Sequence, residues 1–204
     1  VGSEMCIRDS GPKDMYHDGT AKALTFSADE AYCLDGKRLI YSSGTIGQEG
    51  AVYYLESDPF TKVIVHGTYT TSTANTWFEV QSSTGQICYY GNTTGARQSY
   101  TAGNFPRIYA WYLDYVEDPL GNYMNYTYNK WSYCMYPNTI MYGNNKNGST
   151  GLQNTVTFSY ETRSNDPQLF VIEGVKGTMD RRLKTITSKT GNSVYRVYDL
   201  QYNT

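Results

Sequence analysis

Long apolar runs and an excess of charge of either sign are both missing from this chain. Its 204 residues include 17 basic and 19 acidic side chains, which give a formal net charge of −2. So small a net charge provides no long-range field that would attract nucleic acid or an anionic membrane surface. No apolar run approaches the roughly 20 residues that a membrane-spanning helix needs. We therefore expect neither nucleic-acid binding nor membrane insertion by this segment.

Cysteine and histidine are scarce, which argues against metal centres and against thiol or imidazole catalysis. The four cysteines form no C-x-x-C pair, and they are Cys6, Cys33, Cys88 and Cys134. This spacing predicts no zinc site and no disulfide framework, so the thiols are expected to act as small buried hydrophobes. The two histidines are His17 and His66. Because His66 ends an apolar strand pattern, we expect a structural role for it.

Sequence motifs of catalysis are also missing. The chain has no G-x-S-x-G elbow, no H-E-x-x-H pair and no Gly-rich phosphate loop. A glycosidase needs two facing carboxylates, and Glu79 with Glu161, or Asp114 with Glu117, are the available pairs. Each is better explained as the polar face of a strand or as a turn acid. We therefore expect no catalytic residue, no metal ligand and no cofactor.

Tyrosine dominates what the chain does contain. It has 22 tyrosines and 19 glycines, with many Asn, Thr and Ser residues. Tyr and Thr favour a pleated surface, whereas Gly and Asn favour tight turns. Period-2 alternation predicts strands at residues 32–34, 38–41, 52–55, 62–66, 77–81, 86–90, 108–116, 123–128, 154–161, 169–173, 183–187 and 195–202. Surface loops are expected at 69–75 and 143–153. The predicted fold class is all-β, with antiparallel hairpins stacked in an open, curved sheet.

The two ends of the chain look unlike a complete protein. Residues 1–10, VGSEMCIRDS, resemble the translation of a sequencing adapter in a metagenomic gene. We expect them to make almost no packed contacts. Residues 11–29 form a leader of undetermined structure, and 30–204 form one β-domain. The last strand pattern, 195–202, lacks a closing turn, so we expect the domain to be truncated at its C-terminus.

Two segments repeat the same arrangement of strand, polar turn and Tyr-rich return strand. The first contains Asp118-Pro119-Leu120-Gly121-Asn122 and then Tyr126 and Tyr128, whereas the second contains Gly191-Asn192 and then the strand at 195–202. Self-similar hairpins indicate a stacked array, in which each unit buries its face against its neighbours.

These residues resemble two related families. Rhs/YD repeats combine a D-x-x-G-N turn, a Y-x-Y strand and an R-L-x-x-I strand, which is similar to Asp118–Asn122, Tyr126 with Tyr128, and Arg182-Leu183-Lys184-Thr185-Ile186. Upstream, Cys33-Leu34-Asp35-Gly36-Lys37-Arg38-Leu39 is similar to the C-L-D/N-G-x-R-L segment of the SpvB and Tc-toxin B-component family. The order of the later strands is similar too, and the resemblance covers residues 30–203.

The resemblance implies a structural role within a large toxin. In Tc-type toxins, SpvB-like and Rhs segments form strands that spiral into a hollow cocoon around a downstream toxic cargo domain. The implied partners are the rest of the cocoon, the encapsulated toxin domain and a Tc-toxin pore or translocation component. The implied location is extracellular, after release from the cytoplasm of a bacterium. SpvB-type proteins carry a downstream ADP-ribosyltransferase, but nothing in these residues resembles it, so no activity is carried over.

The residues expected to shape the turns and repeats are Asp35, Gly36, Arg38, Asp118, Gly121, Asn122, Tyr126, Tyr128, Arg182, Leu183, Gly191 and Asn192. The main alternative is a secreted or cell-surface carbohydrate-binding or adhesion domain, in which Trp111 or Trp131 would stack on sugar rings. A third hypothesis is that the chain is a fragment of a β-rich hydrolase.

Overall fold

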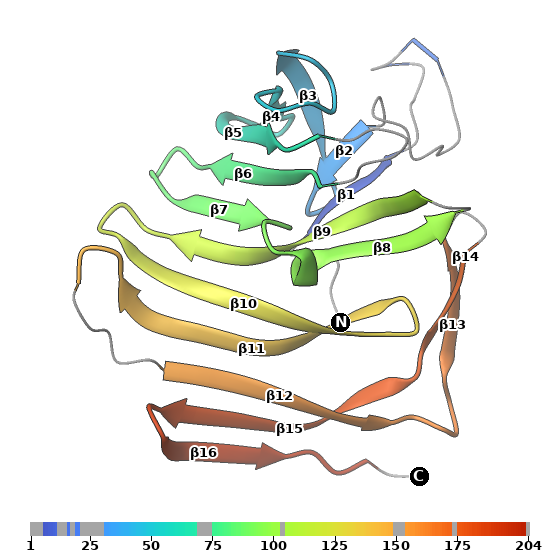
Figure 1. The fold of residues 1–204 in the computed structure, drawn as a ribbon, viewed down its shortest axis with the longest axis vertical. Coiled ribbons are helices and arrows are strands. Elements are labelled where there is room, and N and C mark those ends of the chain that lie inside the picture. The colour runs from blue at the N-terminus through green and yellow to red at the C-terminus, as the bar shows by residue number, and fades with distance from the viewer. Residues whose placement is uncertain are drawn as a thin grey trace. The chain divides into compact units, whose positions relative to one another are not determined.

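The computed structural model describes residues 6–11, 16, 19–20, 31–68, 75–102, 105–148, 154–172 and 175–202. These residues form antiparallel strands, most of which pair with the next strand along the chain (Figure 1). The predicted all-β hairpin fold is therefore confirmed. The chain divides into two compact units, Val1–Asp114 and Tyr115–Thr204, and the division falls within strand β9. Over the described residues, no helix has the length and apolar character needed to cross a membrane.

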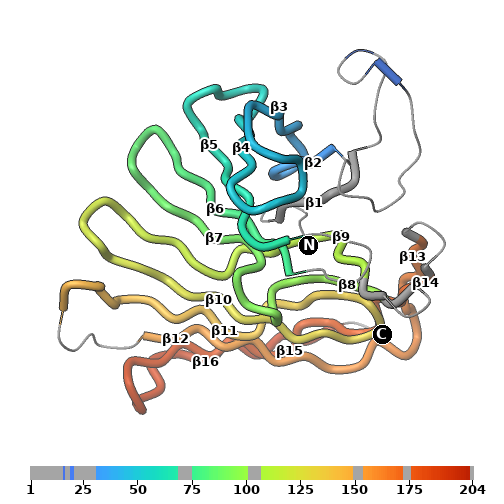
Figure 2. Tube along the Cα trace, turned by 45° about the horizontal axis from the view of Figure 1, so that its top comes forward, coloured from blue at the N-terminus to red at the C-terminus, as the bar shows by residue number. Residues whose placement is uncertain are grey.

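The first unit contains β1 to β8 and most of β9. The elements are β1 (Cys6–Gly11), β2 (Ala31–Leu34), β3 (Lys37–Ser43), β4 (Val52–Leu55), β5 (Asp58–His66), β6 (Trp77–Gln81), β7 (Ile87–Tyr90), the 3-10 helix η1 (Thr94–Ala96), β8 (Arg97–Ala102) and β9 (Phe105–Glu117). The pairing order runs from β1 to β7 and then to β9, with β8 also on β9. β1 pairs with β9 as well, so the path returns on itself. Figure 2 shows β4 to β7 as successive hairpins.

Alternation in these strands builds the core of the first unit. In β5 the side chains of Val63 and Val65 are fully buried, whereas the residues between and beside them are half-buried. β6 repeats the pattern with Phe78 and Val80. Since full burial of such a side chain contributes about 1.5–3 kcal/mol, the period-2 sequence signal reports the main stabilising term of this unit.

An aromatic cluster lies at the centre of that core. The Trp111 ring meets Phe78 at 4.9 Å and Tyr32 at 6.0 Å, both edge to face. Its Nε1 donates a hydrogen bond of 2.6 Å to the Thr76 carbonyl oxygen. Gly91, with φ of +71°, passes so close that a Cβ there would lie 2.3 Å from Trp111 Cδ1. Only glycine fits between β7 and this ring.

The second unit contains the end of β9 and seven further strands. They are β10 (Asn122–Trp131), β11 (Cys134–Asn145), β12 (Asn154–Thr162), β13 (Gln168–Ile172), β14 (Val175–Met179), β15 (Arg181–Thr190) and β16 (Ser193–Asp199). Their order in the sheet is β9-β10-β11-β12-β15-β16. The segment that connects β12 to β15 along the chain contains β13 and β14, which form a separate two-stranded hairpin (Figure 1).

The main sheet of the second unit has little buried surface. Of the buried apolar side chains that the structure describes, only Val116, Cys134 and Tyr136 belong to this unit. Register places a polar row across four strands, Thr127, Thr139, Thr157 and Thr187. The adjacent row, on the opposite face, contains Tyr126, Ile140 and Val156. The side chains on both faces of this sheet thus stay partly exposed to solvent within the unit.

The β10–β11 hairpin turns without glycine. Ser132 and Tyr133 have φ values of +49° and +63°, a left-handed pair that two-residue hairpins normally fill with Asn or Gly. The turn is held from outside, because the Ser132 carbonyl accepts the Thr178 N–H at 3.2 Å. Cys134 Sγ lies 3.6 Å from the Thr178 carbonyl oxygen. Contacts with β14 therefore offset the backbone strain of the turn.

The structure corrects several local expectations. Residues 6–10 belong to the segment 1–10, which was expected to make almost no packed contacts, but together with Gly11 they form β1, which pairs with β2 and β9. The loop predicted at 143–153 begins later, because Asn144 and Asn145 pair with Tyr123 and Asn122. β8, β11 and β14 were missed. Most of 11–29, together with 69–74 and 149–153, lies outside the described residues.

A pair of glycine variants tests the packing of the central cluster. Gly91→Ala should lower the free energy of unfolding by about 2–4 kcal/mol, because it adds a clash with Trp111 to the cost of a left-handed alanine. Gly36 has a φ of +78°, but a Cβ added there would meet no atom within 4 Å. Gly36→Ala should therefore cost only about 1–2 kcal/mol. Chemical denaturation measures both, and equal losses would contradict the clash with Trp111.

Candidate functional site: turns, ion pairs and an exposed edge

The turn after β9 is organised by the Asp118 carboxylate. Its Oδ1 accepts the N–H groups of Leu120 and Asn122, each at 2.9 Å, and its Oδ2 accepts Asn122 Nδ2 at 2.8 Å. Bonds from the side chain and backbone of Asn122 hold the pKa of Asp118 below its ordinary value. Gly121 has φ of +83° and its N–H bonds to the Asp118 carbonyl. Three predicted turn residues are thus brought together here.

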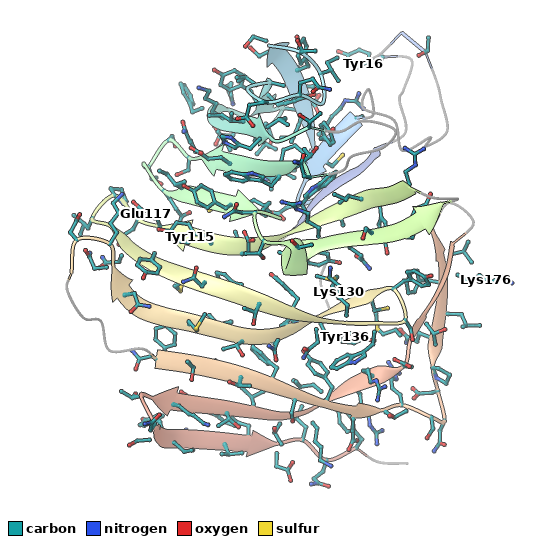
Figure 3. All side chains as sticks on the ribbon, viewed as in Figure 1. Tyr16, Tyr115, Glu117, Lys130, Tyr136 and Lys176 are labelled. Atoms are coloured by element: carbon teal, nitrogen blue, oxygen red, sulfur yellow. The ribbon has the colours of Figure 1, made fainter. Side chains whose placement is uncertain are left out.

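A second segment clamps this turn. Asn145 Nδ2 donates to the Leu120 carbonyl and to Asn122 Oδ1, both at 3.0 Å. The Lys146 N–H bonds to the Gly121 carbonyl, and Lys146 Nζ forms an ion pair with Glu117. Tyr115 and Glu117 lie together on β9 beside the turn, joined by a 2.7 Å hydrogen bond (Figure 3). Sequence reasoning assigned Asn145 and Lys146 to a loop and missed the clamp, since only the β11 register brings them here.

The other predicted turns are simpler. Asp35 and Gly36 join β2 to β3 with φ of +50° and +78°, the left-handed pair of a tight hairpin. Gly191, with φ of +55°, and Asn192 join β15 to β16, where Thr190 pairs with Ser193. The two segments that look like copies therefore differ, because this turn has two residues and no acid equivalent to Asp118.

The remaining predicted residues lie on strands. Tyr126 and Tyr128 on β10 pair with Ile140 and Pro137. Arg38 on β3 pairs with Cys33. On β15, Arg182 Nε bonds to Glu161 Oε1 at 2.7 Å and its guanidinium lies 4.4 Å from the centre of the Tyr202 ring. The Tyr202 hydroxyl donates to the Leu183 carbonyl at 2.5 Å, which ties the residues after β16 back to β15.

Edge strand β16 exposes apolar groups on both faces. Val194, Tyr195, Val197 and Tyr198 are all more than half exposed, and Tyr195 reaches 78%. β16 pairs only with β15 and ends the order of the sheet in the described part of the chain. Its second edge therefore presents backbone N–H and C=O groups beside apolar side chains, which is a template for another strand.

The carboxylates of the candidate catalytic pairs are held by partners. Glu79 bonds to His66 and Gln81, and Glu161 forms ion pairs with Arg182 and Lys184. Asp114 is different, because it is 4% exposed and burial raises its pKa despite a 2.5 Å bond from the Thr93 N–H. Among the residues that the structure describes, no cluster of three or more His, Cys, Asp or Glu could hold a metal ion.

Cysteine behaves as a partly buried apolar residue. Cys33 and Cys88 are half-buried, Cys134 is buried, and all three are free thiols. Burial raises their pKa values, that of Cys88 to about 11, so the thiolate that acts as a nucleophile is disfavoured.

The tryptophans assigned to the carbohydrate alternative require a correction. Trp111 is 1% exposed and cannot stack on a sugar, because its ring fills the core of the first unit. Trp131 is half-buried and packs against Tyr136 and Tyr160, with the Arg181 guanidinium 5.3 Å from its ring centre. On β16, by contrast, the Tyr195 and Tyr198 side chains are more than half exposed.

Variants of the clamp test its contribution. Asn145→Ala should lower the free energy of unfolding by about 1 kcal/mol or more, because it removes three hydrogen bonds: two from Nδ2 to the turn and one that Oδ1 accepts from the Asn147 N–H. Asp118→Ala should also destabilise, and its effect should fade in acid, since a carboxylate with a lowered pKa stabilises above its unfolded pKa and loses that effect as pH falls. Urea titrations at pH 7 and pH 3 measure both. Asp199→Ala, which removes only a bond from Gln201, is the control and should change little.

Asp114 should give the opposite pH dependence. A carboxyl group whose pKa is raised on folding stabilises the fold below its unfolded pKa of about 3.9 and loses that effect as pH rises through the folded value. Asp114→Asn should therefore flatten the decline in stability above pH ~4. A decline that is as steep in the variant as in the parent would show that Asp114 is not its source.

Comparison with known proteins shows the fold but no sequence family. No protein-family model matches the chain, and no curated protein matches it in sequence. The N-terminal domain of the effector protein SpvB from Salmonella typhimurium strain LT2 superposes with a TM-score of 0.65 at 13% identity, over 98% of this chain and 87% of that domain. TcdB2-TccC3-Cdc42 superposes with a TM-score of 0.71 at 14% identity, over 98% of this chain and 12% of the other.

The Tc holotoxin pore of Photorhabdus luminescens gives a similar result. Its TM-score is 0.68 at 14% identity, and the match covers 91% of this chain. The present chain spans only 11% of that chain's length. The resemblance read from the Cys33–Leu39 motif and from the order of the later strands is thus confirmed in three dimensions: the chain has the fold of an SpvB-like, Tc-toxin-like segment.

Proposed function

We propose that this chain is a structural segment of the shell of a large secreted Rhs/Tc-type bacterial toxin, which encapsulates a downstream cargo domain. The observation that carries the proposal is the contrast between the two units. The first has a closed pairing path and a buried core, whereas the sheet of the second has both faces partly open and ends in the exposed strand β16. Such a sheet is suited to continue into further strands.

The fold comparisons support this proposal. Nearly the whole of this chain superposes on a small part of each Tc-toxin chain. Those chains come from structures of TcdB2-TccC3 and of a Tc holotoxin pore. We accordingly propose three partners: the remaining strands of its own cocoon, the encapsulated toxin domain, and a pore or translocation component. An extracellular location after release from the bacterial cell follows from the same role.

The segment is proposed to act as a wall without enzymatic activity. Glu79, Glu117 and Glu161 are all engaged in hydrogen bonds or ion pairs. The buried carboxylate of Asp114 accepts a hydrogen bond from the Thr93 N–H. The geometry of the polar residues serves turns and strand pairing, and no nucleophile–base pair accompanies it among the described side chains.

The edge of β16 provides a direct test. The isolated chain should self-associate with rising concentration, because an unpaired apolar edge pairs with other edges. Tyr195→Lys combined with Val197→Lys should reduce the associated fraction at least about fivefold, since charge on an edge strand blocks such pairing. Light scattering coupled to size-exclusion chromatography measures the associated fraction.

Phe60→Lys is the matched control, because Phe60 is 75% exposed but belongs to β5 in the first unit. It should leave the association unchanged. A longer chain that includes the following strands should be monomeric without any substitution. A parent chain that remains monomeric at all concentrations would argue against the shell proposal and favour the carbohydrate-binding alternative.

Encapsulation is tested in the full-length protein. The downstream domain should resist limited proteolysis when this segment is intact and become cleavable when residues 31–202 are deleted. Calorimetric titration with a panel of glycans tests the alternative. Saturable binding that is lost on Tyr195→Ala or Trp131→Ala would overturn the proposed role in favour of a carbohydrate-binding domain.

A further inference from the structure

An exposed Asn-Gly pair lies beside the clamp on the Asp118 turn. Asn147 and Gly148 follow Lys146, whose N–H bonds to the Gly121 carbonyl, and both residues of the pair are exposed. This is the only Asn-Gly pair in the sequence. The pair is chemically distinctive, because the residue after an asparagine supplies a backbone nitrogen that can attack the asparagine side chain. Gly148 has no Cβ, so nothing on that residue blocks the approach.

The reaction that such a pair undergoes needs only water. The Gly148 backbone nitrogen forms a bond to Cγ of Asn147, its proton leaves with the side-chain nitrogen as ammonia, and a cyclic imide remains. Water then opens the imide at one of its carbonyl groups. Opening at Cγ gives aspartate, whereas opening at the Asn147 main-chain carbonyl gives isoaspartate, in which the main chain runs through the former side chain. No oxidation or reduction takes place.

Two hydrogen bonds to Asn145 hold the reacting groups in a turn. The Gly148 N–H donates to the Asn145 carbonyl at 3.0 Å, and the Asn147 N–H donates to Asn145 Oδ1 at 2.9 Å. The attacking nitrogen must leave its acceptor before it can reach Cγ, so the reaction proceeds when the turn opens. Hydrogen bonds at an exposed turn open at a small cost in free energy. Asn145, which clamps the Asp118 turn, therefore also restrains the reaction at Asn147.

The Asn147 side chain lies where a new charge would act on the clamp. A Cβ added at Gly121 would lie 3.2 Å from Asn147 Nδ2, so this amide borders the turn that Asp118 organises. The charged groups around the turn are Asp118, Glu117 and Lys146, and Lys146 already pairs with Glu117. A carboxylate at residue 147 would thus face the unbalanced charge of Asp118, and like charges repel.

We propose that Asn147 is a site of spontaneous deamidation, and that the aspartate and isoaspartate products loosen the clamp on the Asp118 turn. The clamp thereby weakens with the age of the molecule. Aspartate adds charge repulsion, whereas isoaspartate lengthens the main chain between the two N–H groups that bond to Asn145. This site goes beyond the proposed shell role and does not depend on it, because all of these contacts lie within the second unit.

Mass spectrometry of peptides from the aged full chain tests the reaction. In mildly alkaline buffer, deamidation at Asn147 should be at least about tenfold faster than at Asn92, which is also exposed but precedes the β-branched Thr93. Gly148→Ala should slow the reaction at Asn147 about tenfold, because the added Cβ restricts the backbone. The turn itself should tolerate Gly148→Ala, since that Cβ comes no closer than 3.4 Å to Asn145 and Gly148 has no left-handed φ.

Asn145→Ala tests the restraint by the turn. It removes the Oδ1 acceptor of the Asn147 N–H, so deamidation at Asn147 should be faster in this variant than in the parent. A parent rate at Asn147 no higher than that at Asn92 would overturn the assignment of the site. An unchanged rate in Asn145→Ala would overturn the restraint.

Hydrogen exchange tests the effect on the clamp. The Lys146 N–H, which bonds to the Gly121 carbonyl, should lose protection at least about threefold in Asn147→Asp, a modest effect because the charges are exposed to solvent. Asn147→Ser, which shortens the same side chain without adding charge, is the control and should keep the protection of the parent. An unchanged far-ultraviolet circular-dichroism spectrum shows that each variant folds. Equal protection in all three proteins, or an equal loss in both variants, would overturn the loosening.

Discussion

The packing of Trp111 is the contact on which the first unit depends. Its ring touches Tyr32 on β2 and Phe78 on β6, while its indole N–H reaches Thr76 just before β6. The same ring leaves no room for a side chain at Gly91, which follows β7. One side chain on β9 thus connects four parts of the pairing path. Because a buried aromatic group contributes through area and through edge-to-face geometry together, its neighbours cannot be repositioned independently.

Sequence patterns predicted the strands whose stability comes from burial. β5 and β6 alternate clearly because one face of each lies in the core, so Val63, Val65 and Phe78 could be identified as a set. Asp35-Gly36 and Gly191-Asn192 were predicted as turns because left-handed backbone strongly favours these residue types. The motif order was informative for the same reason: each motif marks a turn or a core position that the fold requires.

The strands that were missed lack such a local signal. β11 contains Pro137, which normally disqualifies a central strand, but here it sits where the β10–β11 register shifts. β14 has Gly177 at its centre, where the Phe170 ring covers the missing side chain. The clamp on Asp118 was invisible for a related reason. Asn145 lies 27 residues beyond Asp118 in the chain, and only the complete register of the hairpin brings the two together.

The Ser132–Tyr133 turn has a consequence for the order in which the second unit assembles. A glycine turn closes its own hairpin, whereas two left-handed side chains resist closure until something else compensates. That compensation comes from Thr178, 46 residues later. The two long strands β10 and β11 should then meet at their turn only after β14 has formed. A segment synthesised in chain order would keep this end unfastened until much of the second unit had emerged, which delays the commitment of the sheet to its final register.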